Sequence, residues 1–175
     1  MTPSAVSLAR EIRLLILDVD GVLTDGSLQF DNRGEEYKTF NSLDGHGIRM
    51  LLENGIDVAI ITGRKSGIVS HRMSELGVEK VMQGRRDKLA AFDELLQAGD
   101  ITPAQVAYVG DDLPDLPVMQ RAGLAIAVAN AHRFVREHCH WVTAAHGGRG
   151  AVREVSDFLL QAQDKLDAIQ QGCLQ

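Results

Sequence analysis

Long apolar runs, cysteine and aromatic residues are all scarce in this 175-residue sequence. No run approaches the roughly 20 apolar residues that span a bilayer, so we expect no membrane partner. The N-terminus lacks the long apolar core of a signal peptide. Cys139 and Cys173 are too few for a disulfide framework or a thiolate metal site. These absences predict a cytoplasmic protein.

Positive charge is also in short supply, with 18 Lys and Arg against 24 Asp and Glu, for a net charge of −6. An acidic chain attracts the phosphate backbone of nucleic acids weakly, so no nucleic-acid partner is expected. The apolar fraction of 45% and the charged fraction of 24% argue against disorder. Without internal repeats or linkers, residues 1–175 are predicted to form a single domain.

Short aliphatic runs alternate with helical patterns along the chain. The runs predict strands buried on both faces at 14–17, 58–61, 80–82, 106–109 and 125–128. Helical spacing predicts helices over 47–53, 88–97 (stopped by Gly99) and 151–169. The alternation predicts an α/β fold, a doubly wound, Rossmann-like parallel sheet with helices on both faces. In such a sheet the ligand binds at the carboxyl ends of the strands.

Residues 26–40 break this rhythm and alternate with a period of two. Leu28 and Phe30 precede the turn-forming sequence Asp-Asn-Arg-Gly at 31–34, and Tyr37 follows it. This pattern predicts a β-hairpin. Because the hairpin directly follows the first strand, we expect it to stand as a flap over the site at the end of that strand.

Aspartates gather after two of the predicted strands. Asp18 and Asp20 come directly after the first strand. Asp111 and Asp112 follow the fourth strand, and Asp115 lies shortly beyond them. A lone acid at such a place is usually a cap or a turn residue, but acids in pairs repel each other and need a cation. The set suits Mg²⁺, which takes few carboxylates and keeps water and substrate phosphate in its shell.

Groups that can bind phosphate follow the other strands. Thr62, Gly63 and Arg64 end the second strand, where a hydroxyl and backbone N–H groups at a helix start can face a phosphate. Lys88 follows the third strand and is a counter-ion for a phosphoryl group, with Arg86 just before it. An Arg64 that only faced solvent at a helix start would be unfavourable against the helix dipole, which favours a functional role for it. For Arg86, a solvent-exposed role and a functional role are equally supported.

In their order along the chain these segments resemble the haloacid dehalogenase superfamily of aspartyl phosphotransferases. The matching pieces are Asp-Val-Asp-Gly-Val-Leu-Thr at 18–24, Ile-Thr-Gly-Arg at 61–64, Lys88 and Gly-Asp-Asp-Leu-Pro-Asp at 110–115. The resemblance implies that Asp18 is the nucleophile and Asp20 the general acid and base. Thr62 and Lys88 would hold the phosphoryl oxygens.

The resemblance also implies a Mg²⁺ site. Its members would be Asp18, the main-chain carbonyl of Asp20, Asp111 and, through water, Asp112. The acid at position 20 indicates a phosphatase, because the dehalogenases of the superfamily lack it. Phosphoryl transfer needs mainly positioning and neutralisation of charge, which these residue types supply.

A narrower resemblance covers nearly the whole chain. Thr-Asp-Gly at 24–26, the run at 40–48 and Gly-Gly-Arg-Gly-Ala-Val-Arg-Glu at 147–154 closely resemble the 3-deoxy-D-manno-octulosonate 8-phosphate phosphatase family. This implies hydrolysis of that sugar phosphate to the free sugar acid, through an aspartyl-phosphate intermediate, in the synthesis of the lipopolysaccharide core precursor. The implied substrate-binding residues are Asp20, Gly63, Arg64 and Arg86.

The gaps between the motifs cannot hold the cap domain that closes the site in most of the superfamily. The resemblance implies a capless homotetramer whose hairpins assemble, so that neighbouring subunits close each site. The C-terminal helix and tail at 151–175 would fold over an adjacent site.

Three alternatives stay open. A phosphatase for a nine-carbon ulosonic (sialic-type) acid 9-phosphate would share the capless plan. A receiver-like signalling domain also uses clustered Asp, Thr and Lys, but its phosphoacceptor ends the third strand, where this sequence has Met82 and Gln83. A catalytically silent subunit is disfavoured by the presence of the complete set of acids with Thr62 and Lys88.

Overall fold

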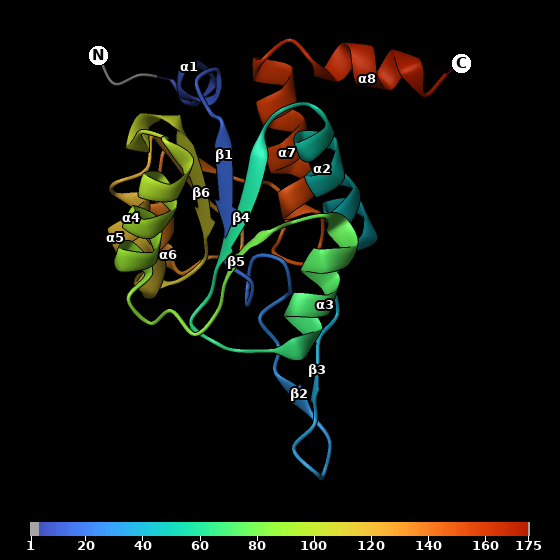
Figure 1. The fold of residues 1–175 in the computed structure, drawn as a ribbon, viewed down its shortest axis with the longest axis vertical. Helices are drawn as coiled ribbons and strands as arrows, with labels where there is room; N and C mark the ends of the chain where they lie inside the picture. The colour runs from blue at the N-terminus through green and yellow to red at the C-terminus, as the bar shows by residue number, and fades with distance from the viewer. Residues whose placement is uncertain (1–3, 175) are drawn as a thin grey trace.

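The computed structural model describes residues 4–174, and a six-stranded sheet lies at its centre, in the order β5-β4-β1-β6-β7-β8 (Figure 1). Every neighbouring pair of strands is parallel. The strands are β1 (Leu14–Leu17), β4 (Asp57–Ile61), β5 (Lys80–Met82), β6 (Val106–Gly110), β7 (Leu124–Ala127) and β8 (Trp141–Val142). The predicted doubly wound α/β fold is confirmed; β8 was not predicted.

Helices cover both faces of the sheet. Figure 1 shows α2, α3 and α7 on one side and α4, α5 and α6 on the other. The helices are α1 (Ala5–Ala9), α2 (Ser42–Glu53), α3 (Gly67–Leu76), α4 (Lys88–Gly99), α5 (Leu116–Met119), α6 (Arg133–Arg136), α7 (Ala151–Ala162) and α8 (Leu166–Gly172). None of the helices described is long and apolar enough to cross a membrane.

The strands are aliphatic because both faces of the sheet are covered. All residues of β1, β6 and β7 are buried, and Tyr108 in β6 is among the largest side chains of the core. The edge strand β5 is only partly buried, which contradicts the predicted burial on both faces. It has a single neighbour, β4, and therefore stands partly in solvent.

Two helix boundaries differ from the prediction. α2 begins at Ser42 rather than at 47, because the Asn41 side chain accepts a backbone hydrogen bond (2.8 Å) and caps the helix. α4 includes Gly99 rather than stopping at it, and Asp100 takes the left-handed conformation at the C-cap (φ 47°). In both cases a local side-chain or backbone cap, rather than apolar spacing, determines where the helix begins or ends.

The predicted single helix over 151–169 is wrong, because the chain breaks into α7 and α8 at Asp164, which has φ 57°. Contacts with distant segments hold the break. Gln163 Nε2 donates to the carbonyl of Ala9 at the end of α1 (3.2 Å) and to that of Ile12 just beyond it (2.8 Å). Lys165 Nζ donates to the carbonyl of Asn54 at 2.8 Å. α8 therefore runs across the end of α7 (Figure 1).

The predicted hairpin is formed by β2 (Gln29–Phe30) and β3 (Glu36–Tyr37), which pair antiparallel. It projects beyond the carboxyl ends of the parallel strands, away from the body of the molecule (Figure 1). In the described chain, this hairpin is the only paired structure between β1 and α2, and α3 is the only helix between β4 and β5.

The start of α7 is capped by a residue from another helix. Gly150, at the N-cap position with φ 102°, has no side chain to accept the first free N–H groups. The buried Asp44 of α2 accepts from Gly150 N (3.3 Å) and from Arg153 N (2.9 Å) instead. Burial raises the pKa of Asp44, and these hydrogen bonds oppose the rise. Asp44 therefore joins α2 to α7.

We expect Asp44→Ala to destabilise the fold by about 1–3 kcal/mol, because two N–H groups lose their buried acceptor. The free energy of unfolding from urea titration measures this loss. Asp167→Ala, which removes an exposed carboxylate in the first turn of α8, is the matched control and should change stability by less than about 0.5 kcal/mol. Equal effects of the two substitutions would contradict the capping role.

Candidate active site

The carboxyl ends of β1, β4, β5 and β6 meet around one cavity of about 390 Å³. Every residue predicted from the sequence for catalysis, substrate binding or metal binding lines this cavity. Arg85, Pro114 and Asp115 line it as well. The sheet therefore brings together four segments that are far apart in the sequence.

A buried lysine lies between two carboxylates at the base of the cavity. Lys88 Nζ is 2.8 Å from Asp18 Oδ2 and 2.7 Å from Asp115 Oδ1, and its side chain is 6% exposed. Burial alone would lower the pKa of Lys88, but the two carboxylates raise it, so the ammonium is maintained. Asp87, the neighbour of Lys88 in the chain, does not compete for the Lys88 ammonium, because its side chain caps α4 by accepting from Ala90 N (3.0 Å).

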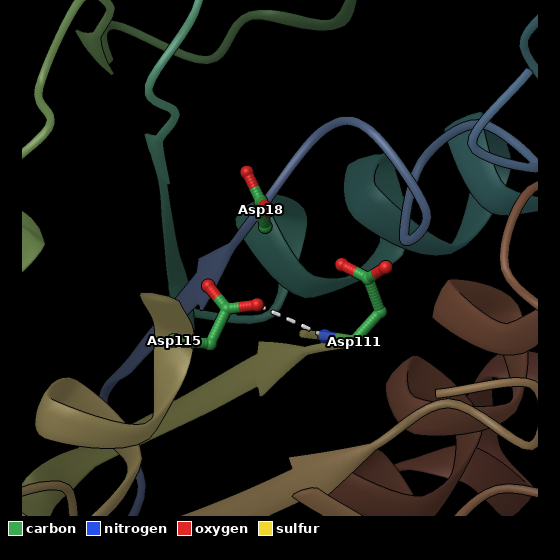
Figure 2. A group of neighbouring side chains, drawn as sticks. All are labelled: Asp18, Asp111 and Asp115. Carbon is green, nitrogen blue, oxygen red and sulfur yellow. Dashed lines mark hydrogen bonds between the residues drawn. The ribbon is translucent and has the colours of Figure 1, made fainter. Parts of the chain in front are cut away.

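Asp115 organises the loop that follows β6. Its Oδ1 accepts from the hydroxyl of Tyr108 (2.6 Å) as well as from Lys88. Its Oδ2 accepts from the backbone N–H groups of Asp111 (3.0 Å) and Asp112 (3.2 Å), the first of which is drawn in Figure 2. Both oxygens of Asp115 are thus occupied by donors of the protein. Tyr108 was not among the predicted site residues, because the sequence pattern marks it only as part of a buried strand.

The carboxylates of Asp18, Asp111 and Asp115 form a group whose ligand atoms all lie within 4.8 Å of one another (Figure 2). Burial and the charge of Asp115 raise the pKa of Asp18 to about 6 and that of Asp111 to about 7. The single ammonium of Lys88 therefore leaves negative charge uncompensated. Each oxygen of Asp115 has two protein partners, whereas each oxygen of Asp18 has one, Val19 N at Oδ1 (2.7 Å) and Lys88 Nζ at Oδ2. Asp18 and Asp111 are therefore the carboxylates better suited to a hard divalent cation.

Gly21 makes this grouping possible. Its φ of 94° lies in the region that favours glycine, and a Cβ there would lie 2.1 Å from Asp111 Oδ2. Any side chain at position 21 would therefore displace the Asp111 carboxylate. The loop after β1 and the loop after β6 approach this closely because residue 21 has no side chain.

The other two predicted metal ligands were expected to act through a main-chain carbonyl (Asp20) and through water (Asp112), not through a directly bound carboxylate. Asp112 is exposed, and its carboxylate accepts from Leu113 N (2.8 Å) at the start of a short 3₁₀ turn. Among the described residues, the carboxylates of Asp112 and Asp20 do not join the three-carboxylate group. The chain order alone could not separate Asp112 from Asp115, since both follow the same strand.

Thr62, Gly63 and Arg64 lie in a loop rather than at a helix start as predicted, since α3 begins at Gly67 after its N-cap residue Ser66. Thr62 is buried, and its N–H donates to the carbonyl of the last residue of β5 (3.0 Å). Gly63 and Arg64 are exposed at the mouth of the cavity.

Arg86 and Arg85 differ in what surrounds them. Arg86 is exposed in the cavity wall and has no ion pair with any residue that the structure describes, so its guanidinium can bind an anion. Arg85 pairs with Glu94 of α4. Arg149, in the glycine-rich segment at 147–154, pairs with Asp25 at 3.2 Å.

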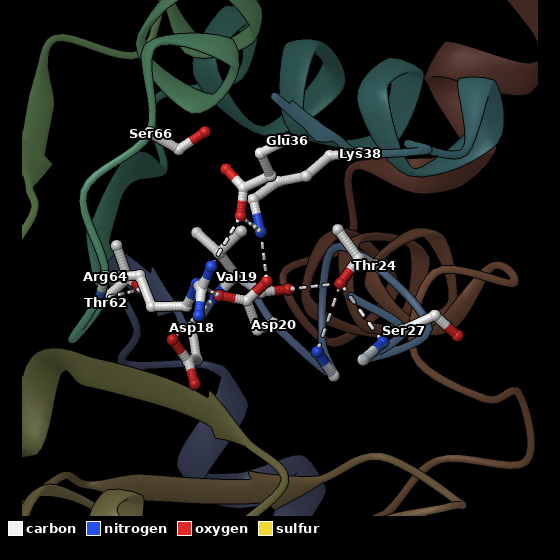
Figure 3. Close-up of polar contacts among 12 residues, drawn as sticks. Asp18, Val19, Asp20, Thr24, Ser27, Glu36, Lys38, Thr62, Arg64 and Ser66 are labelled. Carbon is white, nitrogen blue, oxygen red and sulfur yellow. Dashed lines mark hydrogen bonds and ion pairs between the residues drawn. The ribbon is translucent and has the colours of Figure 1, made fainter. Parts of the chain in front are cut away.

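Two charged residues of the hairpin reach the site, and the sequence analysis missed them. Lys38 Nζ contacts Asp20 Oδ1 and lies 3.3 Å from Glu36 Oε1 (Figure 3). Arg64 Nη2 donates to Glu36 Oε1 at 2.8 Å, and Arg64 Nε is 3.7 Å from Asp20 Oδ2. The spacing of Glu36 and Lys38 by two in the extended segment 26–40 places residue 36 in β3 and residue 38 just beyond it on a common face, but this local pattern does not show that the face meets Asp20.

Comparison with known proteins identifies relatives of the whole chain. A family model described as haloacid dehalogenase-like hydrolase matches residues 77–155. The 3-deoxy-D-manno-octulosonate 8-phosphate phosphatase of Salmonella typhimurium is 54% identical over 167 residues, which are 95% of this chain and 89% of that protein. The crystal structure of the Yersinia pestis enzyme of the same name has a TM-score of 0.92 at 53% identity, with 93% of this chain and 88% of that chain covered.

A third relative was solved with ligands. The 3-deoxy-D-manno-octulosonate 8-phosphate phosphatase of Moraxella catarrhalis, in complex with a magnesium ion, a phosphate ion and a KDO molecule, is 41% identical. It has a TM-score of 0.94, and the match covers 96% of this chain and 97% of that one.

The raised pKa values of Asp18 and Asp111 predict a coupling between pH and metal binding. Both folded-state pKa values exceed the unfolded value of about 3.9, so these groups favour the metal-free fold at low pH, and that contribution is lost as pH rises from about 4 to 7. A cation that binds the ionised carboxylates restores this contribution to the stability of the fold. The increase in melting temperature on addition of Mg²⁺ should therefore be larger at pH 8 than at pH 5.

Asp111→Asn, which keeps the shape of the side chain, should remove most of this pH-dependent Mg²⁺ effect. Asp57→Asn, at the amino end of β4 and outside the cavity, should leave it unchanged. A Mg²⁺ shift that does not depend on pH, or that survives in Asp111→Asn, would contradict the assignment.

Proposed function

The chain belongs to the 3-deoxy-D-manno-octulosonate 8-phosphate phosphatase family of haloacid dehalogenase-like hydrolases, and we propose that Asp18 is its nucleophile. It is a Mg²⁺-dependent phosphoric monoester hydrolase that releases phosphate and the free sugar acid, a precursor of the lipopolysaccharide core. The observation that supports the nucleophile is the pairing of Asp18 with the buried Lys88 at 2.8 Å. An anionic nucleophile can meet an anionic phosphate only where such a cation screens their repulsion.

In the first half of the reaction, the Asp18 carboxylate attacks phosphorus and the bond to the sugar oxygen breaks. Asp20 gives its proton to that oxygen, and the free sugar acid leaves. The phosphoryl group remains on Asp18 as an acyl phosphate. The hydroxyl of Thr62, the N–H of Gly63 and the ammonium of Lys88 bind its oxygens as charge accumulates on them.

In the second half, Asp20 takes a proton from water, and the water oxygen attacks phosphorus. Cleavage of the bond between phosphorus and the Asp18 oxygen releases phosphate and regenerates the carboxylate. The open cavity admits water to this position, since no part of the described chain covers it. Asp115 holds Lys88 at 2.7 Å throughout, because both of its oxygens are anchored.

The cation would be held by Asp18, Asp111 and the main-chain carbonyl of Asp20, with Asp112 acting through water. When bound, Mg²⁺ neutralises charge on the phosphoryl oxygens. At the other end of the substrate, Arg64 and Arg86 at the cavity mouth are suited to the carboxylate of the sugar acid.

The alternative functions are not favoured. Relatives over 50% identical carry the name of the eight-carbon sugar phosphate, which disfavours the nine-carbon substrate and a silent subunit. A receiver-like domain is disfavoured as well, because β5, the third parallel strand along the chain, ends at Met82 with no aspartate after it.

We also propose that the enzyme is a capless, single-domain homotetramer in the cytoplasm. The hairpin supports the assembly, since Leu28, Phe30 and Tyr37 are 50%, 54% and 53% exposed on an element that projects from the body. Such exposed apolar groups suit burial against further copies of the chain. Neighbouring subunits would then close the cavity. The two free cysteines suit a reducing compartment.

We expect Asp18→Asn to fold but to lose phosphate release by on the order of 10³-fold or more, because an amide cannot act as the nucleophile. The assay is Mg²⁺-dependent phosphate release from 3-deoxy-D-manno-octulosonate 8-phosphate, with a nine-carbon ulosonic acid 9-phosphate beside it. The wild type should prefer the eight-carbon substrate. Full activity of Asp18→Asn would exclude Asp18 as the nucleophile. Preference of the wild type for the nine-carbon acid would overturn the assignment of the eight-carbon substrate.

Phe30→Ser should weaken the assembly, because it removes an apolar side chain from the hairpin. Sedimentation velocity at several protein concentrations measures the effect as a shift from tetramer to smaller species. Val6→Ser, at a residue 48% exposed in α1, is the control and should leave the mass unchanged. A wild type that sediments as a monomer would exclude the tetramer.

A further inference from the structure

Lys38 is the most deeply buried charged group of the hairpin, with a side chain only 2% exposed. A buried ammonium is costly unless it is paired. Its partners are Asp20 Oδ1, in the loop after β1, and Glu36 Oε1, two residues earlier in β3. The burial therefore depends on a contact between the hairpin and the loop that carries the proposed acid.

The same two segments are joined a second time through Arg64. Its Nη2 donates to Glu36 Oε1 at 2.8 Å, and its Nε lies 3.7 Å from Asp20 Oδ2. Asp20 is thus held firmly at Oδ1 by Lys38 and only loosely at Oδ2 by Arg64 (Figure 3). Oδ2 is the oxygen left to meet the substrate.

Glu36 limits how strongly Lys38 binds Asp20. Since the ammonium lies between two carboxylates, part of its attraction goes to Glu36. Glu36 and Lys38, the latter just beyond β3, reach the site together because residues two apart in an extended segment share a face. Tyr37, between them, is exposed.

We propose that Lys38 is a positioning residue, which holds Asp20 in the orientation that delivers a proton to the leaving oxygen. The inference rests on the proposed function, in which Asp20 is the general acid. It adds that the hairpin itself orients the acid, so that the flap is part of the proton-transfer machinery as well as an assembly element.

If Lys38 positions the acid, the loss of kcat/KM caused by its substitution should depend on the leaving group. A sugar alkoxide leaves only with a proton, whereas p-nitrophenolate leaves readily without one. The ratio kcat/KM reports the steps up to transfer of the phosphoryl group to Asp18, before Asp20 acts on water. A residue that only stabilises the fold would lower kcat/KM for both substrates alike.

The experiment compares kcat/KM for 3-deoxy-D-manno-octulosonate 8-phosphate and for p-nitrophenyl phosphate in the Mg²⁺-loaded enzyme. Lys38→Met should lose about 10- to 100-fold on the sugar phosphate and less than about 3-fold on the aryl phosphate. Asp20→Asn should show the same selectivity with a larger loss. Lys80→Met, which breaks the ion pair with Asp57 at the opposite end of β4 and β5, is the matched control and should change neither value.

Melting temperatures establish that each variant is folded, and Lys38→Gln replaces Lys38→Met if the latter does not fold. If Asp20→Asn shows the selectivity but the Lys38 variant loses equally on both substrates, or loses nothing, the positioning role is overturned. If Asp20→Asn itself lost nothing on the sugar phosphate, Asp20 would not be the acid, and the proposed function would fail at that residue.

Discussion

The site depends on one buried ammonium among carboxylates. Lys88 compensates only part of the charge of Asp18, Asp111 and Asp115, which the fold crowds within 4.8 Å of one another. Without a bound cation, such crowding of carboxylates is unfavourable, and the raised pKa values of Asp18 and Asp111 reflect this unfavourable free energy. The remaining negative charge is what makes the cavity a place for a divalent cation and a phosphoryl group.

The rest of the architecture maintains that crowding. Asp115 is anchored by Tyr108 and by two backbone N–H groups, so that it holds Lys88 without moving. Close backbone packing also supports the loop after β1, since a Cβ at Gly147 would lie 1.7 Å from the carbonyl of Gly21. The cap that Asp44 provides for α7 joins this C-terminal segment to α2.

The hairpin carries apolar groups outward and charged groups inward. Phe30 and Tyr37 are exposed where further copies of the chain can cover them, while Lys38 and Glu36 reach Asp20 and Arg64. In the proposed capless, tetrameric arrangement, the hairpin would serve both assembly and orientation of the acid. Docking of subunits on it would then restrain the same element that contacts Asp20 through Lys38.

By itself the sequence determined the parallel sheet, the order of five of its six strands along the chain and most of the residues that line the cavity, because aliphatic runs and polar strand ends are local patterns. Only the tertiary structure decided which carboxylates meet. Asp112 and Asp115 follow the same strand, yet a 3₁₀ turn exposes the first and buries the second. The break between α7 and α8 and the contact of Lys38 with Asp20 likewise depend on partners distant in the sequence, which no local pattern encodes.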